Sequence, residues 1–402
     1  MLNGKNIVLG VTGSIAAYKI ANLASMLVKL HASVHVIMTK NACQFITPMT
    51  FETLTGHRCL VDTFDRNHDF QVEHVSLAKL ADLILVAPAS ANVIGKMAHG
   101  ICDDMLTTTV LASKAPKLVA PAMNTGMWQN PILQDNLSTL QHYGFRIIAP
   151  ATGRLACGDV GEGKLPSEEL LLQHILLEVG APHDWAGRRV LVTAGPTQEA
   201  IDPVRFITNH SSGKMGYALA KMAQMRGAEV TLVSGPVALE PFAGVEVVDV
   251  RSAADMYDAV TQRAAQLDVI IMCSAVADYT PAQYADHKVK KSDNELQIAL
   301  RRTQDILLHL GQHKPQGQVL VGFSMETENL LENSRAKLVK KNADLICANS
   351  IVEAQTGFGV DTNRVTLIAA NEVKELPLCS KEETADAILS YIQQSFFPSA
   401  HD

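Results

Sequence analysis

The sequence lacks three features that would each indicate a particular class of protein. None of its seven cysteines, at positions 43, 59, 102, 157, 273, 347 and 379, forms a CxxC pair, so neither a zinc site nor a disulfide framework is indicated. Its longest apolar runs, Leu83–Ala89 and Val269–Ala277, are far shorter than the roughly 20 residues of a membrane-spanning helix. The amino terminus shows no signal-peptide pattern. We therefore expect a reduced, cytoplasmic protein without a membrane segment.

Aromatic residues and net positive charge are also scarce. Aromatics make up 5% of the chain, with two tryptophans, which leaves little surface for stacking on single-stranded nucleic acid. Thirty-four basic and 41 acidic residues give a net charge of −7, which opposes broad binding to nucleic acid. Apolar residues, at 47%, and charged residues, at 19%, are in the balance of a folded chain with a sizeable core. We expect small-molecule partners and no nucleic acid.

The length and the pattern of the chain predict two domains. The 402 residues suggest two domains of about 200 each. Short β-rich runs alternate with helical periodicity in both halves, which is typical of parallel sheets covered by helices on both faces. The polar segment 180–189 separates the two halves. The predicted fold is α/β, with two tandem Rossmann-like three-layer domains and largely parallel sheets, over residues 1–187 and 188–402.

The predicted strands fix where ligands should bind, because parallel sheets bind ligands beyond the carboxyl ends of their strands. The strands of the first half are Asn6–Val11, Val34–Thr39, Leu83–Ala87, Leu118–Ala120 and Phe145–Ala149. The strands of the second half are Val190–Thr193, Glu229–Val233, Val245–Val250, Asp268–Cys273, Val319–Phe323 and Asp344–Ala348, followed by a hairpin of Arg364–Ala369 and Glu372–Leu378.

Three strands of the first half end in segments of small and amide side chains. These segments are VTGSIAAYK (11–19), VAPASAN (86–92) and APAMNTGMW (120–128). Small residues let the backbone approach an anion, and the helix that follows offers free N–H groups. Each segment alone is as readily an ordinary loop. Together they suggest a cofactor pocket with a place for a phosphate group.

These segments resemble the flavin-dependent cysteine decarboxylase family, whose PxMNxxMW pattern fits residues 121–128. The resemblance implies FMN as cofactor, with His74 in the active site and Asn124 on the substrate. It makes Cys157, in the glycine-rich segment 151–166, the proton donor of a lid without regular structure. Without the resemblance, His74 would be a surface or capping histidine and Cys157 an idle loop thiol. The cofactor positions implied are Gly13, Ser14, Ile15, Thr39, Pro88, Ala89, Ser90, Asn92 and Met127.

The second half places basic residues beside strand ends. A loop of about twenty residues ends in SSGKMG (211–216), a possible phosphate cradle, but Met215 after Lys214 departs from the P-loop pattern and disfavours a P-loop NTPase. In the run HKVKKSD, Lys288 and Lys290 would share one face of an extended segment, with Lys291 opposite. Such a run is usually a solvated surface, but it could also neutralise a triphosphate and its leaving pyrophosphate.

These segments resemble the phosphopantothenate–cysteine ligase domain of the bacterial bifunctional coenzyme A synthesis proteins, and the resemblance covers nearly the whole chain. It implies that the carboxylate of phosphopantothenate attacks CTP and that cysteine captures the acyl-cytidylate. Arg205 and Asn209 then belong to the acyl site, and Lys288 is catalytic. The implied nucleotide positions are Met272, Cys273, Ser274, Asp278, Lys288, Asp305, Ile306, Leu307, Phe323, Lys337 and Lys341.

One departure from that family lies at Gln304, where the family commonly has proline between Thr303 and Asp305. Its loss is expected to loosen a nucleotide-contacting loop. No metal ligand is identified: Asp278 could serve the nucleotide or a divalent ion, and Mg²⁺ would be held largely by the CTP phosphates. The preference for CTP over ATP depends on the resemblance alone.

The expected function is therefore a bifunctional enzyme that makes and then decarboxylates 4′-phosphopantothenoylcysteine. One alternative keeps the FMN fold with another substrate, as in flavin prenyltransferases or peptidyl-cysteine decarboxylases, but these have no need of the second domain. Another is a regulatory flavoprotein without catalysis, which the presence of His74, Asn124 and Cys157 disfavours. By analogy with the family, trimers of the first domain and dimers of the second would build a closed dodecamer.

Overall fold

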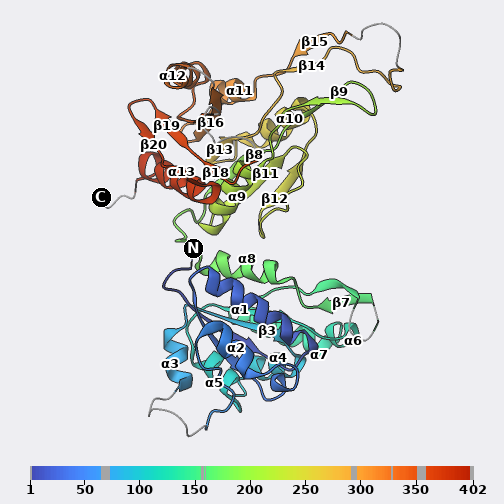
Figure 1. The fold of residues 1–402 in the computed structure, drawn as a ribbon, viewed down its shortest axis with the longest axis vertical. Coiled ribbons are helices and arrows are strands. Elements are labelled where there is room, and N and C mark those ends of the chain that lie inside the picture. Colours follow the sequence, from blue (N-terminus) through green and yellow to red (C-terminus); the bar gives the residue numbers. More distant parts are fainter. Residues whose placement is uncertain are drawn as a thin grey trace. The chain divides into compact units, whose positions relative to one another are not determined.

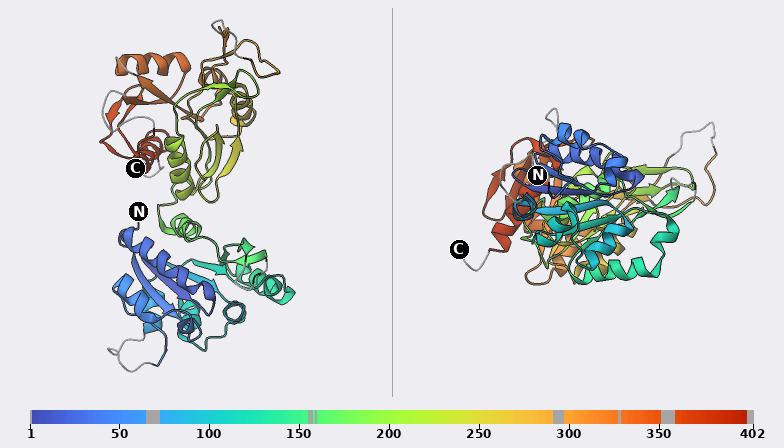
Figure 2. Two further views of the ribbon diagram at one scale, coloured as in Figure 1. Left: turned by 45° about the vertical axis from the view of Figure 1, so that its right-hand side comes forward. Right: turned by 90° about the horizontal axis from the view of Figure 1, so that it is seen from below.

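The computed structural model describes residues 2–64, 73–154, 158, 160–290, 297–326, 329–350 and 359–398. It divides into two compact units, residues 1–182 and 183–402, each of which is described by itself (Figures 1 and 2). Trp185 is fully buried, and its backbone N–H donates a hydrogen bond to the carbonyl of Arg226 at 2.9 Å. Residues just after Pro182 therefore pack as part of the second unit.

The described part of the first unit contains a five-stranded parallel sheet in the order β2-β1-β3-β4-β5. Its strands are β1 (Asn6–Val11), β2 (Ser33–Met38), β3 (Leu83–Ala89), β4 (Lys117–Pro121) and β5 (Arg146–Ile147). Its helices are the short η1 (Ile15–Tyr18) and η2 (Ala42–Gln44), with α1 (Lys19–Lys29), α2 (Pro48–Thr55), α3 (Glu73–Leu80), α4 (Ala91–Ala98), α5 (Met105–Ala112), α6 (Thr125–Trp128), α7 (Pro131–His142) and α8 (Glu168–Val179).

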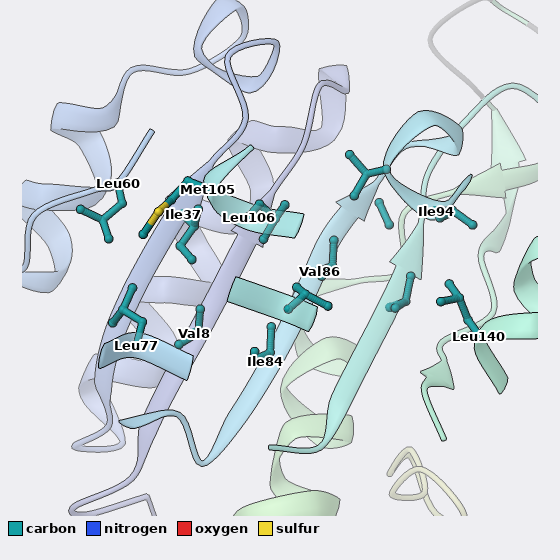
Figure 3. Close-up of a cluster of buried hydrophobic side chains, with 14 of the residues drawn as sticks. Val8, Ile37, Leu60, Leu77, Ile84, Val86, Ile94, Met105, Leu106 and Leu140 are labelled. Carbon is teal, nitrogen blue, oxygen red and sulfur yellow. The ribbon is translucent and has the colours of Figure 1, made fainter. Parts of the chain in front are cut away.

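The core of the first unit explains why these strands read as continuous apolar runs. All residues of β3 are buried, as are five of the six residues of β1, because helices cover both faces of the sheet. On one face, Val8, Ile84 and Val86 of the sheet pack with side chains of α3, α4, α5 and α7 (Figure 3). On the other face, α1 packs against α8 (Figure 1).

The second unit has an eight-stranded sheet in the order β12-β11-β8-β13-β16-β17-β19-β20 over its described residues. The strands from β12 to β17 are parallel, and β19 and β20 are antiparallel additions. The strands are β8 (Arg189–Ala194), β11 (Glu229–Ser234), β12 (Glu246–Asp249), β13 (Val269–Met272), β16 (Val319–Glu326), β17 (Leu345–Ser350), β19 (Val365–Ala369) and β20 (Val373–Glu375). The helices are α9 (Lys214–Met225), α10 (Ala253–Ala264), α11 (Ile306–His313), α12 (Leu330–Lys341) and α13 (Lys381–Phe396).

The predicted α/β class and the parallel sheets are confirmed, and so is the late hairpin, which is formed by β19 and β20. The glycine-rich segment 151–166, expected to lack regular structure, contains instead the antiparallel hairpin of β6 (Ala151–Arg154) and β7 (Val160–Lys164), so that expectation is wrong. Gly163 allows close packing, because a Cβ there would lie 2.3 Å from the carbonyl oxygen of Met123.

Three further two-stranded pairs lie outside the main sheet of the second unit. They are β9 (Gln198–Ala200) with β10 (Phe206–Thr208), β14 (Tyr279–Pro281) with β15 (Leu300–Arg302), and β18 (Thr362–Asn363) with β21 (Cys379–Ser380). The pair β9–β10 occupies the loop of about twenty residues that separates β8 from α9. In the described residues, no helix has the length and apolar character needed to cross a membrane.

The strand order of each sheet determines where a ligand can bind. In the first sheet the chain moves from β1 outward to β2 and then back to β3 on the other side of β1. In the second sheet the same reversal separates β8 from β13. A crevice opens at such a switch point, at the carboxyl ends of the two strands. Each unit therefore has one topological position for a site, between β1 and β3 or between β8 and β13.

Candidate functional sites

At the switch point of the first unit, a buried hydroxyl connects the loop after β1 to the loop after β3. Thr12, the residue after β1, donates its Oγ1 hydrogen to the carbonyl of Pro88 at 2.6 Å and accepts the backbone N–H of Ser90 at 2.9 Å. The loops after β1 and β3 are thereby held together. Thr12 was not among the predicted site residues, although its place within VTGSIAAYK, directly after a strand, was a signal for it.

The loop after β1 passes very close to the loop after β2. A Cβ on Gly13 would lie 2.7 Å from the Cβ of Asn41, so this approach requires a glycine. The Oγ of Ser14 accepts the N–H of Ala16 at 3.3 Å and caps η1. Thr39 donates its N–H to the carbonyl of Val11 at 3.0 Å. The predicted residues Gly13, Ser14 and Thr39 therefore lie at one edge of the sheet.

The loops after β3 and β4 meet at the same edge. Pro88 and Ala89 are buried in β3 and contribute through their backbone, since the carbonyl of Ala89 accepts the N–H of Ala122 at 3.2 Å. The Oγ of Ser90 accepts the N–H of Val93 at 3.4 Å and caps α4, on whose first turn Asn92 is exposed.

Asn124 lies at the start of α6, where its Oδ1 accepts the N–H of Gly126 at 2.8 Å. The preceding residue, Met123, donates its N–H to the carbonyl of Gly163 in β7 at 2.9 Å. Asn124 is thus positioned between the end of β4 and the β6–β7 hairpin. In this unit Ile15 and Met127 leave apolar side chains 58% and 49% exposed.

Glu162 fastens the hairpin to α6. Its carbonyl accepts the hydroxyl hydrogen of Thr125 at 2.8 Å, and its carboxylate accepts the indole N–H of Trp128 at 3.0 Å. Both partners belong to the APAMNTGMW segment. The hairpin that carries the Cys157 region is therefore attached to the segment that carries Asn124.

The other two predicted catalytic residues of this unit come from separate elements. His74 is the second residue of α3, the helix that leads into β3, and is half-buried. Cys157 lies outside the described residues, between the described strands β6 and β7. The roles of His74, Asn124 and Cys157 stay predictions.

Two buried hydroxyls hold the switch point of the second unit. The Oγ1 of Thr193, in β8, accepts the N–H groups of Cys273 and Ser274 at 3.0 and 3.1 Å. The Oγ1 of Thr197 accepts the N–H of Ala277 at 3.0 Å. The predicted positions Cys273 and Ser274 are thereby fixed at the end of β13. Neither threonine was predicted, although both lie at or just beyond a predicted strand.

Asn209 is attached to the same strand end, because its Nδ2 donates to the carbonyl of Ala275 at 2.9 Å.

Burial raises the pKa of the neighbouring Cys273 thiol to about 12, with Lys381 acting in the opposite direction. This thiol stays protonated at neutral pH and is therefore a poor nucleophile.

A pocket opens beside these residues at the first turn of α9. Lys214 pairs with Asp361 at 2.7 Å, and burial, with Lys214 nearby, lowers the pKa of Lys381. The Oδ1 atoms of Asn349 and Asn363 are buried without a hydrogen-bond partner in the described part of the chain. The lining residues are Ser211, Ser212, Gly213, Lys214, Met215, Gly216, Cys273, Ser274, Ala275, Phe323, Ser324, Met325, Asn349, Asn363 and Lys381.

Five of these lining residues were missed: Ser324, Met325, Asn349, Asn363 and Lys381. Asn349 lies in β17, immediately after the run predicted for that strand, so its place near a strand end was a usable signal. Asn363 and Lys381 come from the carboxyl-terminal part of the chain, and no motif there marked them.

A second group of predicted nucleotide residues lies on α11 and α12. Lys337 donates to the carbonyl of Phe323 at 2.7 Å, and Lys341 pairs with Asp305. Asp305 caps α11 by accepting the N–H of Leu308 at 3.0 Å. Burial alone would raise the pKa of Asp305, but the hydrogen bond from Lys341 and further contacts outweigh it and the pKa is lowered.

The remaining nucleotide positions differ in their exposure. Ile306, Leu307 and Met272 are 4%, 9% and 8% exposed and belong to the core of the second unit, so their side chains are not available as polar contacts. Asp278 is exposed, and its carbonyl accepts the N–H of Thr303 at 3.0 Å. Within the described ranges, no group of three or more His, Cys, Asp or Glu residues is arranged to hold a metal ion.

The predicted acyl-site arginine is tied to the lysine run. Arg205 donates to Asp202 and also to the carbonyl of Val289, at 2.6 Å from its Nη2. Val289 lies between Lys288 and Lys290, which are both exposed. Lys291 lies outside the described residues. The structure therefore joins two segments that the sequence had indicated separately.

Both units match known family models. Residues 1–180 match the model described as "Flavoprotein", and residues 185–396 match "DNA/pantothenate metabolism flavoprotein C-terminal domain". The chain is 48% identical over 398 residues to the coenzyme A biosynthesis bifunctional protein CoaBC of Bacillus subtilis, covering 98% of this chain and 97% of that one. It is 45% identical over 395 residues to the protein of the same name from Vibrio cholerae, covering 98% and 99%. A solved structure, the C-terminal domain of a CoaBC protein, is 48% identical and covers 53% of this chain and 97% of its own, with a TM-score of 0.46.

Proposed function

The chain belongs to the family of coenzyme A biosynthesis bifunctional proteins, and we propose that its two units catalyse consecutive reactions. In this proposal the second unit joins cysteine to 4′-phosphopantothenate with CTP. The first unit then decarboxylates the product to 4′-phosphopantetheine with FMN. The observation that carries the proposal is that each unit has its own switch point, at which the motif segments of that half meet.

The residues at the first switch point fit a flavin mononucleotide. The loop at Gly13 has no room for a side chain, and the hydroxyls of Ser14 and Ser90 lie beside backbone N–H groups that suit a phosphate. The exposed side chains of Ile15 and Met127 offer apolar surface for a planar ring. When bound, FMN supplies a two-electron oxidation at the thiol-bearing carbon of the substrate and the later return of those electrons.

The proposed decarboxylation follows from the chemistry of an acylated cysteine. Loss of CO2 leaves an electron pair that needs an acceptor, and oxidation of the C–S carbon to a thioaldehyde provides one. Asn124 would hold the substrate carboxylate or amide, and His74 would assist removal of the thiol proton. Cys157 would protonate the resulting enethiolate, since an unperturbed thiol with a pKa near 8.5 is mostly protonated at neutral pH.

The proposed ligation has two steps in the second unit. The carboxylate of phosphopantothenate attacks the α-phosphate of CTP, and the bond to the β-phosphate breaks to release pyrophosphate. The cysteine amine then attacks the acyl carbon, CMP leaves with the bonding pair, and the amine proton goes to solvent. Lys288 and Lys290 would neutralise the leaving pyrophosphate, and Lys337 and Lys341 would reach the nucleotide. Mg²⁺ would be held largely by the CTP phosphates.

A mass-spectrometric assay of the purified protein tests both reactions. The protein is incubated with 4′-phosphopantothenate and cysteine, and with CTP, ATP, GTP or UTP in turn. We expect phosphopantetheine and CMP with CTP, and flavin absorbance in the protein as purified. A colourless protein, or product formation that does not need a nucleotide, would contradict the proposal.

We also propose that the chain is a homo-oligomer. By analogy with the family, three-fold contacts of the first unit and two-fold contacts of the second would close a dodecamer. Sedimentation analysis of the full chain tests this, and a monomer across the micromolar range would contradict it.

A further inference from the structure

A buried carboxylate lies in the turn of the β9–β10 hairpin. Asp202 is 2% exposed, in the turn that joins β9 to β10. Aspartate is almost never fully buried unless it is paired, so the partners of this side chain should explain its place. None of the sequence motifs had assigned it a role.

The two carboxylate oxygens of Asp202 have different partners. Oδ1 accepts the backbone N–H groups of Val204 and Arg205, each at 2.8 Å. Oδ2 accepts hydrogen bonds from Nε and Nη2 of Arg205 at 3.0 and 2.5 Å, and from the backbone N–H of Val289 at 3.1 Å. The guanidinium first, and then the backbone N–H groups, hold the pKa of Asp202 well below its ordinary value.

Only the Oδ1 contacts are needed to shape the turn, because a side-chain oxygen that binds the N–H two residues on closes an Asx-turn. Asparagine could make these contacts equally well. One Oδ2 contact reaches Val289, which is 87 residues further along the chain. The other two come from Arg205, whose guanidinium uses the negative charge and also donates to the carbonyl of Val289. The carboxylate is therefore explained by Arg205 and Val289 together and not by the Asx-turn.

The contacts from Asp202 and Arg205 hold the backbone of one residue, Val289, at both its N–H and its carbonyl. Asp202 accepts the N–H of Val289, and Arg205 donates to the carbonyl of Val289 at 2.6 Å. A third bond between the same two segments, from the N–H of Ala285 to the carbonyl of Ile201, measures 3.0 Å. The backbone between Lys288 and Lys290 is thereby fixed relative to the loop that also carries Asn209.

This matters for the lysines because side chains at i and i+2 of an extended segment point to the same side. Fixing the N–H and the carbonyl of Val289 determines which side Lys288 and Lys290 face. A charged group acts on a developing charge only if it is held in the right place, and a displacement of 1 Å can cost about 100-fold in rate.

We infer that Asp202 is a positioning residue for acyl-cytidylate formation: through Val289 and Arg205 it sets the lysine pair against the triphosphate. The inference rests on the ligase function proposed above. Asp202 touches neither substrate in this assignment and acts through the segments that it joins.

The test uses the full-length protein and measures pyrophosphate release from CTP and phosphopantothenate before cysteine is added. We compare Asp202→Asn with Asp286→Asn, which removes the same charge from an exposed position on the segment that carries Lys288 and Lys290. D202N is expected to lower kcat/KM about 10- to 100-fold, and D286N to leave it within about twofold. Adding Lys288→Gln to D202N should then reduce the rate by less than about threefold, because a lysine that is already displaced contributes little to catalysis.

Hydrogen–deuterium exchange separates a local effect from unfolding. In D202N the amide of Val289 should exchange faster while the amides of β8 and β13 keep their protection. If D202N unfolds the second unit, Arg205→Lys takes its place, because Arg205 is exposed at the hairpin and carries the same predictions for Val289 exchange and for the K288Q double mutant.

The outcomes separate this inference from the proposed function. If the wild-type protein releases no pyrophosphate, the proposed ligase function fails. If the wild-type protein is active but D202N and R205K keep its rate, or if their losses add fully to that of K288Q, only the positioning role of Asp202 is overturned.

Discussion

His35 illustrates how one half-buried side chain makes the first unit sensitive to pH. It lies in β2 and stacks on His57 with ring centroids 4.3 Å apart, and both rings contact Ser33 Oγ, at 3.2 and 3.1 Å. Burial, and then the neighbouring His57, lowers the pKa of His35 from 6.5 to about 4. The ring is therefore neutral in the folded protein at neutral pH.

Acidification is expected to destabilise the first unit through this residue. Between pH 6.5 and about 4 the unfolded chain binds a proton at His35 that the folded chain excludes, so the free energy of unfolding falls as the pH falls. Allowing for the partial exposure of the ring, we expect a loss of about 1–2 kcal/mol between pH 7 and 4.5. Urea unfolding measures it, followed by tryptophan fluorescence, to which Trp128 of the first unit and Trp185 of the second both contribute. His35→Gln should reduce this pH dependence and the exposed-site control His142→Gln should not; equal slopes in all three proteins would contradict the prediction.

Asn209 gives a second prediction at the scale of a residue. Its Nδ2 donates to the carbonyl of Ala275 at 2.9 Å, and Asn209→Asp would place a carboxylate against that carbonyl oxygen. Losing this bond and adding the repulsion should slow ligation about 10- to 100-fold. Decarboxylation of supplied phosphopantothenoylcysteine should keep its rate, because it belongs to the other unit. Parallel loss of both activities would show that the two sites are not independent.

Among the elements, the β6–β7 hairpin is held to α6 by close backbone packing. Gly163 has a φ of +127°, and its Cβ position lies 2.3 Å from the carbonyl oxygen of Met123. Gly153, in the facing strand, would meet only the side chain of Lys164, at 3.5 Å. The same substitution therefore has different consequences at the two positions.

Gly163→Ala should release the hairpin from α6, whereas Gly153→Ala should be tolerated. We expect G163A to lose about 1–3 kcal/mol of stability, because the backbone conformation is strained for alanine and the carbonyl must move. Its decarboxylation rate should fall more than that of G153A. Thermal unfolding and the mass-spectrometric assay measure both effects, and matching values for the two variants would refute the role of the hairpin contact.

Most of the main-sheet elements could be predicted from the sequence, because parallel strands such as β1 and β3 are buried on both faces and appear as short apolar runs. The β6–β7, β9–β10 and β14–β15 hairpins could not. Their strands are three to five residues long and mostly exposed or half-buried, and β6, β7 and β15 also carry glycine, lysine or arginine, so no apolar alternation marks them.

The candidate sites were predictable to a similar degree. Ser90, Asn124 and Cys273 could be chosen because each directly follows a predicted strand or belongs to a motif. Asp202 and Lys381 could not, because their importance depends on partners far along the chain.

At the scale of the whole molecule, the chain contains two units with separate cores and separate switch points. The amino-terminal end of the second unit is set by Trp185, which is fully buried, and by Asp184, which pairs with Arg226. Arg226 also pairs with Asp386 at 3.1 Å and so connects this end to α13.

Two fragments that differ by five residues test where the second unit begins. Residues 183–402 should fold and retain ligation, whereas 188–402 lacks Asp184 and Trp185. Loss of one buried tryptophan costs about 3–5 kcal/mol, so the shorter fragment should unfold at distinctly lower denaturant concentration. Circular dichroism during guanidinium titration measures the difference. Coincident curves would place the start of the unit at residue 188.

Thr12 and Thr193 have the same structural role in the two halves of the chain. Each is a buried hydroxyl near the end of the first strand of its sheet, and each holds the neighbouring loop across the reversal of strand order. Exchange of either for valine keeps the volume but leaves the backbone groups that the hydroxyl had bonded without that partner. If the two units act as proposed, replacing that oxygen with a methyl group in the first unit would impair decarboxylation and let the condensed intermediate accumulate. The same change in the second unit would limit the formation of the intermediate.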